Sequence, residues 1–135
     1  MPFYSAELTV PPNTPASDPL EEDINLFPGL ITHVWLQFPR GCAGLLHARI
    51  LRSTVQIWPT NPNADFASDG FMIEWAEQYD SLDEPNTLTL SGYNLDDTYP
   101  HTVTLWLEVT DAAIYQAAQQ QSSMLTKFLQ LVGLK

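Results

Sequence analysis

The sequence predicts a mainly β protein: an antiparallel β-sandwich of seven or eight strands, jelly-roll-like, followed by one long C-terminal α-helix. Short runs of alternating apolar and polar residues recur up to residue 109, with turn residues between them. All 11 prolines lie in that part of the chain. Residues 111–134 contain no proline and repeat apolar residues at three- and four-residue steps. We therefore expect a β-sandwich domain at residues 1–109 and a helix at residues 110–135, which is either part of the same structural unit or an assembly arm.

The first strands are predicted close to the N-terminus. Residues 3–10 alternate, so that Leu8 and Val10 share one face. Pro11 ends this strand because proline cannot donate a hydrogen bond to a β-ladder. A short candidate strand follows at residues 21–27.

The strongest strand signal lies at residues 30–38. Strict alternation there places Leu30 with Val34 on one face, and Ile31 with Trp35 on the other. The sequence thus predicts that Leu30 points into the core and that Ile31 points away from it.

Further strands are predicted at residues 45–52, 55–58, 71–79, 88–90 and 102–109. The spacing of these short strands, with turn residues between them, is typical of a sandwich or barrel. An eight-stranded jelly roll fits the length, and a seven-stranded immunoglobulin-like sandwich is the alternative. The chain lacks the alternation of strands and helices that a parallel nucleotide-binding sheet needs.

The C-terminal segment predicts an amphipathic helix that Thr110 or Asp111 caps and Gly133 ends. At about 1.5 Å per residue it would span about 36 Å, which is longer than a small sandwich is wide. Its heptad spacing favours a seam with other copies, with the polar Gln121 setting the register. Packing on its own sandwich and lying on a membrane surface are the alternatives. The predicted interface comprises Ile114, Ala117, Gln121, Met124, Leu125, Phe128, Leu131 and Val132, with Trp35 and Trp106 as neighbouring contacts.

Composition and charge disfavour several function classes. Sixteen acidic and five basic residues give a net charge of −11, which disfavours nucleic acid and anionic membranes as direct partners. The chain has no run of about 18 apolar residues, so we expect no membrane-spanning helix, and we expect no secretory signal at the N-terminus. The single cysteine, Cys42, excludes a disulfide within the chain and is expected to be a small buried turn residue.

Two polar loops could bind calcium or a sugar. In the loop at residues 59–70, Asn61, Asn63 and Asp65 alternate as calcium ligands do, but Phe66 stands where the EF-hand loop needs glycine. Turns formed by asparagine and proline are the favoured interpretation of this loop.

The second loop spans residues 93–101 and carries Asp96, Asp97 and Tyr99. A cation would relieve the repulsion between the adjacent carboxylates, although a solvated turn is the simpler interpretation. Trp58 is a further candidate because sugar rings stack on flat aromatic rings, and Trp35 and Trp106 could face a sugar, a partner or the long helix.

Catalytic motifs are not evident. His33, His47 and His101 are never two or four residues apart, so we expect neither a metal site nor any cofactor. The chain also lacks a Gly-x-Ser-x-Gly turn and a glycine-rich phosphate loop. We therefore expect a protein that is not an enzyme.

Four segments in combination resemble small jelly-roll virion accessory proteins of tailed phages, of the decoration, cement or spike type. They are TPASDP at residues 14–19, FPRGCAG at 38–44, QIWPTNP at 56–62 and GYNLDDTY at 92–99. The resemblance covers roughly residues 1–109 and carries over no functional residue. It implies a non-enzymatic assembly role, contact with a shell or tube protein, and a place in a virion; otherwise the chain is expected to be cytoplasmic.

The sequence therefore predicts a structural protein that self-associates, or docks on a larger assembly such as a shell, through its C-terminal helix. A homo-oligomer is the expected state. The alternative is a carbohydrate- or calcium-dependent binding module that uses the loops at residues 59–70 and 93–101.

Overall fold

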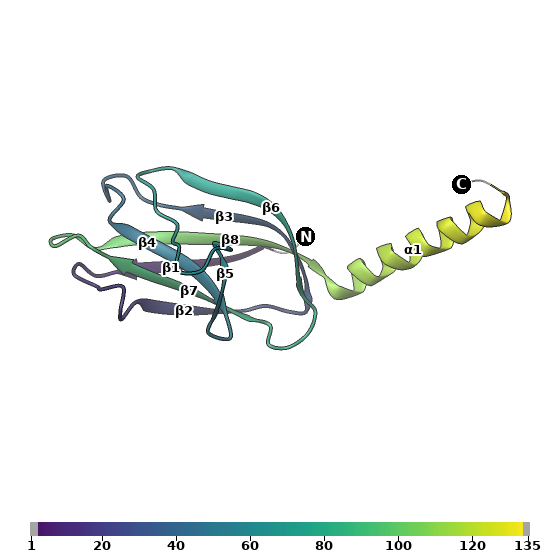
Figure 1. Ribbon diagram of the computed structural model, residues 1–135, viewed down its shortest axis with the longest axis horizontal. Helices are drawn as coiled ribbons and strands as arrows, with labels where there is room; N and C mark the ends of the chain where they lie inside the picture. Colours follow the sequence, from purple (N-terminus) through teal and green to yellow (C-terminus); the bar gives the residue numbers. More distant parts are fainter. Residues whose placement is uncertain (1–2, 134–135) are drawn as a thin grey trace.

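The computed structural model describes residues 3–133, with the side chains of residues 112, 115, 116, 118 and 119 excepted. The strands form two antiparallel four-stranded sheets that pack face to face, and one helix follows them (Figure 1). This confirms the predicted β-sandwich with a single C-terminal helix. The elements are β1 (Phe3–Val10), β2 (Leu20–Asn25), β3 (Gly29–Gln37), β4 (Leu46–Arg52), β5 (Val55–Trp58), β6 (Met72–Ser81), β7 (Thr87–Asn94), β8 (His101–Asp111) and α1 (Ala112–Leu131).

The strand order is that of a jelly roll. One sheet has the order β1-β8-β3-β6 and the other β2-β7-β4-β5. The first strand therefore pairs with the last, the second with the seventh, the third with the sixth and the fourth with the fifth, as in a long hairpin rolled into a sandwich. Of the two predicted architectures, this order matches the eight-stranded jelly roll.

The core lies between the two sheets and is built from the alternate residues of each strand. Alternate residues of β1, β4 and β8 are buried, among them Leu8 and Val10 of β1, because each strand turns one face to the opposite sheet. Each large side chain contributes about 1.5–3 kcal/mol by leaving water. No described residue of α1 belongs to this core. Its largest fully buried side chains are Val10, Ile31, Val34, Leu36, Phe38, Leu46, Ile50, Leu88, Leu90, Val103, Leu105 and Leu107.

The predicted faces of β3 are wrong at its start. The register shifts between Ile31 and His33 in both pairings of β3, and in the pairing with β6 the extra residue lies on β6. In the pairing with β8 it is Thr32 of β3, which has no partner there and marks a β-bulge. The extra residue exchanges the two faces. Ile31 is therefore fully buried on the same side as Val34, whereas Leu30 is only half-buried.

The junction between sandwich and helix has no linker. β8 ends at Asp111, whose carboxylate Oδ1 accepts a hydrogen bond of 2.8 Å from the Ala113 backbone N–H and so caps α1. After Leu131 the chain turns at Gly133, which has a φ of 78°, as a helix-ending glycine does. The remainder of the predicted helix segment, residues 134–135, lies outside the described residues.

α1 projects away from the sandwich. It leaves the end of the molecule at which the described chain begins, and it points away from both sheets (Figure 1). Its 20 residues correspond to a length of about 30 Å. The arrangement differs from a helix packed along its own sandwich, one of the alternatives that the sequence left open.

Candidate functional site

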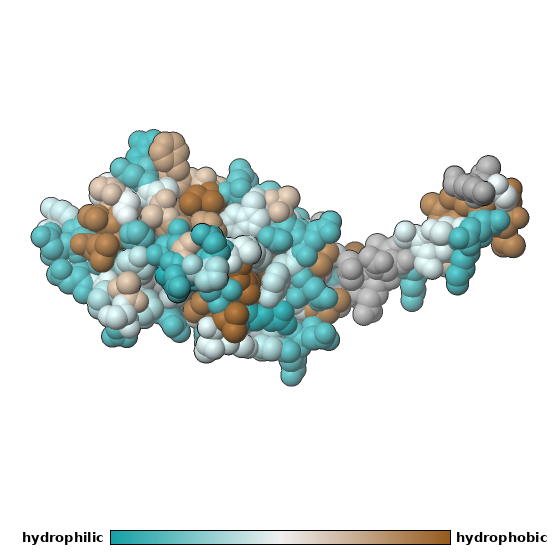
Figure 2. All heavy atoms as spheres, in the orientation of Figure 1, coloured by the Kyte–Doolittle hydropathy of each residue, from teal (hydrophilic) through white to brown (hydrophobic). Residues whose placement is uncertain are grey.

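One side of α1 presents an uncovered apolar surface. Its smaller or polar members, Ala117 and Gln121, are exposed. Figure 2 shows hydrophobic residues gathered at the far end of the helix, away from the sandwich. We call this surface the apolar stripe; its large members and their exposed fractions are Ile114 62%, Met124 69%, Leu125 59%, Phe128 59%, Leu131 86% and Val132 52%.

The opposite side of α1 is polar. Ser123 and Gln130 lie there, by the helical period of 3.6 residues per turn, and Lys127 lies between that side and the stripe; all three are exposed. The helix is therefore amphipathic, although no part of the described sandwich covers its apolar side. A contiguous exposed apolar surface of this kind marks an interaction site more often than scattered apolar residues do.

A second exposed apolar surface lies on the outer face of the β1-β8-β3-β6 sheet, which we call the Trp35 face. Trp35 on β3 and Trp106 on β8 are direct cross-strand partners. Phe3 packs against Trp35 with ring centroids 5.6 Å apart, and Met72 completes a shallow hollow of ≈ 260 Å³. Phe3 is 60% exposed and Met72 46% exposed.

The Trp35 face and the apolar stripe are connected through one strand. Trp106 lies on β8, which continues directly into α1. Phe3 pairs with Glu108, so it lies near the end of the sheet from which the helix leaves. The structure thus brings Trp35 and Trp106 together, as neighbours on one face, but it does not place the helix of the same chain over them.

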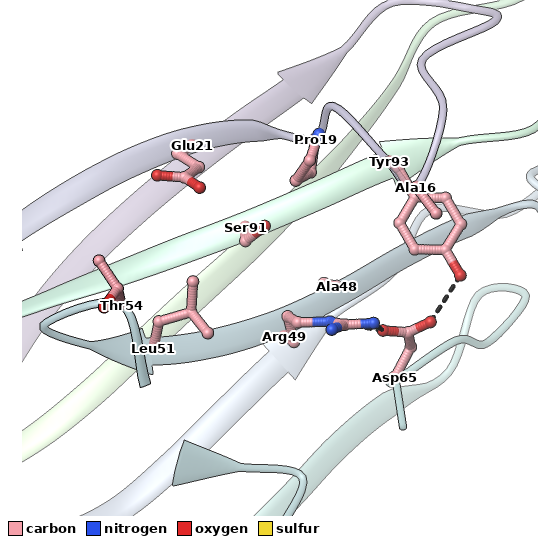
Figure 3. Close-up of a pocket in the computed structure, with 10 residues that line it drawn as sticks. All are labelled: Ala16, Pro19, Glu21, Ala48, Arg49, Leu51, Thr54, Asp65, Ser91 and Tyr93. Carbon is pink, nitrogen blue, oxygen red and sulfur yellow. Dashed lines mark hydrogen bonds and ion pairs between the residues drawn. The ribbon is translucent and has the colours of Figure 1, made fainter. Parts of the chain in front are cut away.

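A polar pocket of ≈ 230 Å³ occupies the outer face of the other sheet (Figure 3). Its most connected residue is Asp65, which belongs to the loop at residues 59–70. Arg49 donates to Asp65 Oδ1, with its Nε at 2.7 Å, and the Tyr93 hydroxyl donates to Asp65 Oδ2 at 2.5 Å. His47 stacks on Tyr93 with ring centroids 4.6 Å apart.

The backbone explains why these groups meet. His47 and Tyr93 are cross-strand partners of β4 and β7, and Arg49 follows on the same outward face. β5 pairs with β4 only from Ile50 onward, so the rest of that edge of β4 is free for the loop. Phe66 occupies it, because its backbone exchanges hydrogen bonds of 2.8 and 2.9 Å with Ala48.

Tyr93 holds its proton unusually tightly. Burial comes first among the causes, followed by the hydrogen bond to Asp65 and the repulsion from the Asp65 carboxylate. Together they raise the pKa of Tyr93 to about 12. The phenol is therefore a hydrogen-bond donor at neutral pH and does not act there as a base.

These contacts bear on the residues predicted to bind calcium or sugar. The Asp65 carboxylate already accepts from Arg49 and Tyr93, which leaves its oxygens committed to donors within the chain. Asn63 has a positive φ of 64° and so forms a turn, and the Asn61 carbonyl accepts from a Gln56 side chain.

Trp58 is only 6% exposed. It packs edge-on against Trp75 and Tyr79, with ring centroids 5.5 and 5.3 Å away. Its ring thus contributes to the core and presents no free face on which a sugar could stack.

The loop at residues 93–101 is a hydrogen-bonded turn. Asp96 Oδ1 accepts from the backbone N–H of Thr98 at 2.9 Å, and Asp96 Oδ2 lies 2.8 Å from His101 Nε2. The backbone bond from Thr98 and then the bond to His101 lower the pKa of Asp96. Asp97 accepts from the Thr98 hydroxyl at 2.8 Å, and Tyr99 is 65% exposed.

The buried Asn94 fixes this turn. Its amide donates to the carbonyls of Val10 and Tyr99 at 3.1 and 3.0 Å, and its oxygen accepts from the Asp96 backbone N–H. The two predicted ligand loops are therefore held by separate internal networks, one centred on Asp65 and one on Asn94.

Within residues 3–133, no group of three or more histidine, cysteine or acidic side chains is arranged to hold a metal ion. His33 lies 3.1 Å from Glu74, away from His47 and its partner Asp65. Cys42 is fully buried, as predicted, and its thiol donates to the Ser68 carbonyl at 3.0 Å. Among the described helices, none has the length and apolar character needed to cross a membrane.

Sequence reasoning missed the cluster of Arg49, Tyr93 and Asp65. Their separation along the chain hides it, and only the pairing of β4 with β7 brings the first two together. The alternation in residues 45–52 does signal that Arg49 points outward, but it does not identify the partner. A search for related proteins finds no matching family model and no matching curated protein.

Proposed function

We propose that this chain is a non-enzymatic assembly protein, which self-associates or docks on a larger structure through α1. The observation that carries the proposal is the apolar stripe, whose large side chains are all more than half exposed. Most of the stability of helices in proteins comes from tertiary packing of their apolar side rather than from intrinsic helix propensity. A partner surface would supply that packing here.

The Trp35 face extends the proposed interface. Trp35 and Trp106 lie on the sheet that contains β8, the strand that runs into α1, so a partner held by the helix would lie close to them. Aromatic side chains and methionine are enriched at the centres of protein interfaces. We include these residues as neighbouring contacts, with the helix as the principal anchor.

A virion-type role is the most specific form of this proposal. It is supported by the resemblance of four loop segments to phage accessory proteins and by the jelly-roll strand order, which suits such a role. The alternative of a calcium- or sugar-binding module receives less support, because Asp65 is engaged by Arg49 and Trp58 is buried.

The experiment compares the mass of the full chain with that of a form ending at Asp111, by light scattering over a range of concentrations. The shortened form should fold, because no described helix residue belongs to the core. We expect an oligomer for the full chain and a monomer for the shortened form. Equal monomeric masses would count against self-association.

A further inference from the structure

The polar pocket on the outer face of the β2-β7-β4-β5 sheet encloses a hydroxyl group that has no partner. Ser91 points outward from β7, because its neighbours Leu90 and Gly92 face the core, yet only 3% of Ser91 is exposed. Among residues 3–133 its hydroxyl has no hydrogen-bond partner. Every fully buried side-chain oxygen in that range has one, so the Ser91 hydroxyl opens to the pocket that it lines (Figure 3). We call this space the Ser91 pocket.

The strand register places an acidic and a basic side chain on either side of Ser91. Ser91 pairs with Glu21 on β2 and with Arg49 on β4, so the three side chains form one row on the outer face of the sheet. With strands about 4.8 Å apart, Glu21 and Arg49 start about 10 Å from each other. The short serine between two long side chains leaves the space that forms the pocket. The Glu21 carboxylate has no partner in the described part of the chain, so it is free to bind a ligand.

The guanidinium of Arg49 is held in place and keeps a free donor group. Its Nε and Nη2 both donate to Asp65 Oδ1, and the Tyr93 hydroxyl fixes Asp65 Oδ2. Nη1 of Arg49 has no partner among the described residues, so its hydrogens remain available. A donor that is fixed before binding loses little conformational entropy when a ligand arrives.

These groups select a neutral ligand that carries several hydroxyls. Arg49 can only donate, Glu21 can only accept, and Ser91 can do both. Glu21 and Asp65 outnumber Arg49 by one negative charge, which disfavours an anion, and the cationic Arg49 disfavours a second cation beside it. A hydroxyl both donates and accepts, so a molecule with a ring of hydroxyls can satisfy all three side chains.

The size of the Ser91 pocket suits a single sugar ring. Its volume of ≈ 230 Å³ is below the range of about 300–1,000 Å³ that larger ligands occupy. It equals about eight water molecules of about 30 Å³ each, and covalently bonded atoms pack more closely than that, so about a dozen atoms besides hydrogen fit. Ala16, Pro19 and Leu51 add apolar surface, against which the C–H groups of a sugar can lie.

We propose that the Ser91 pocket binds one sugar ring, either a free monosaccharide or the terminal residue of a glycan, with Ser91, Glu21 and Arg49 bonding to its hydroxyls. The site differs from the predicted sugar sites, because Trp58 and the loop at residues 93–101 apart from Tyr93 have no part in it. It also lies on the sandwich and not on α1, so its failure would leave the proposed assembly role untouched, and the converse holds as well.

The first test titrates the full ¹⁵N-labelled chain with glucose, galactose, mannose, fucose and xylose, and with their methyl glycosides, and follows the backbone amide resonances. We expect saturable shifts confined to the residues around Ser91. Equal binding of a methyl glycoside would identify a glycan terminus as the ligand, and binding of the free sugars alone would identify a monosaccharide. Shifts that do not saturate, or that centre elsewhere, would overturn the proposal.

Two pairs of variants assign the binding to the row of side chains. Ser91→Val fills the floor of the pocket, and Thr89→Val makes a similar change on the same strand and face, outside the pocket. We expect the first to abolish the saturable shifts and the second to keep them.

Glu21→Ala removes the free carboxylate, and Glu22→Ala makes the same change at the next residue, which does not line the pocket. Losing a hydrogen bond to a charged group should weaken binding about 10-fold or more for Glu21→Ala, and leave it unchanged for Glu22→Ala. Glu21 is exposed on the edge strand β2, so this pair decides the matter even where Ser91→Val fails to fold. Wild-type affinity in Glu21→Ala would overturn the proposal, and the amide spectrum verifies the fold of each variant.

Discussion

Replacing Phe128 by aspartate is the sharpest test of the apolar stripe. Phe128 is 59% exposed in the single chain, and a phenylalanine offers about 200 Å² of surface, so a partner can still cover about 120 Å². At about 25 cal/mol per Å², the substitution removes about 3 kcal/mol of association free energy for each copy. This corresponds to about a 100-fold weaker association per copy, before the cost of burying a carboxylate is added.

The assay follows mass against protein concentration, with Gln130→Asp as the control on the polar side of α1. We expect Phe128→Asp to disperse the assembly and Gln130→Asp to keep it. The thermal unfolding of the sandwich should stay the same in the dispersed form, because Phe128 is not part of the core. An unchanged mass would refute the interface, and an unfolded variant would show that the helix stabilises its own domain.

Four further predictions concern the sandwich and its charges. Leu105→Ala removes a side chain that is 1% exposed and should cost about 2–5 kcal/mol of unfolding free energy, measured in urea; a smaller loss would argue against the close packing at this position. Asp65→Asn should lower the pKa of Tyr93 from about 12 toward 10.0, as read from tyrosine absorbance against a Tyr93→Phe control. Because the folded-state pKa of Tyr93 is raised, its contribution to stability is present below pH 10.0 and is lost as pH rises through about 12. The pKa of Asp96 is lowered in the folded state, so its contribution to stability is present above pH 3.8 and is lost as pH falls through the folded-state pKa. Asp96→Asn should therefore reduce the fall of the urea midpoint at acid pH. An unchanged fall would show that other carboxyl groups cause it. Raising the salt concentration should strengthen self-association, because it screens the repulsion between acidic sandwiches, and weaker association in salt would contradict that reasoning.

The sequence predicted the strands because alternation is a local signal. Leu8 and Val10, which share one face of the predicted first strand, both point inward in β1, since no irregularity interrupts its pairing with β8. The bulge at Thr32 has no comparable signal in the sequence, and one extra residue was enough to exchange the faces of Leu30 and Ile31.

The sequence predicted one candidate site and missed another. The stripe of α1 follows from helical periodicity, which needs no knowledge of distant residues. The network of Arg49, Asp65 and Tyr93 depends on strand pairing and on a loop laid along β4, so it could not be derived from spacing. Trp58 illustrates the same limit, because an aromatic residue beside a polar loop has the same sequence pattern whether it is buried or exposed.

The direct passage from β8 into α1 has a mechanical consequence. β8 is bonded along both edges, to β1 and to β3. A pull on the helix along the strand direction would load both rows of hydrogen bonds in shear, so that many would have to break together. A tether attached at α1 would thus transmit tension into the middle of a sheet, where the domain resists it best.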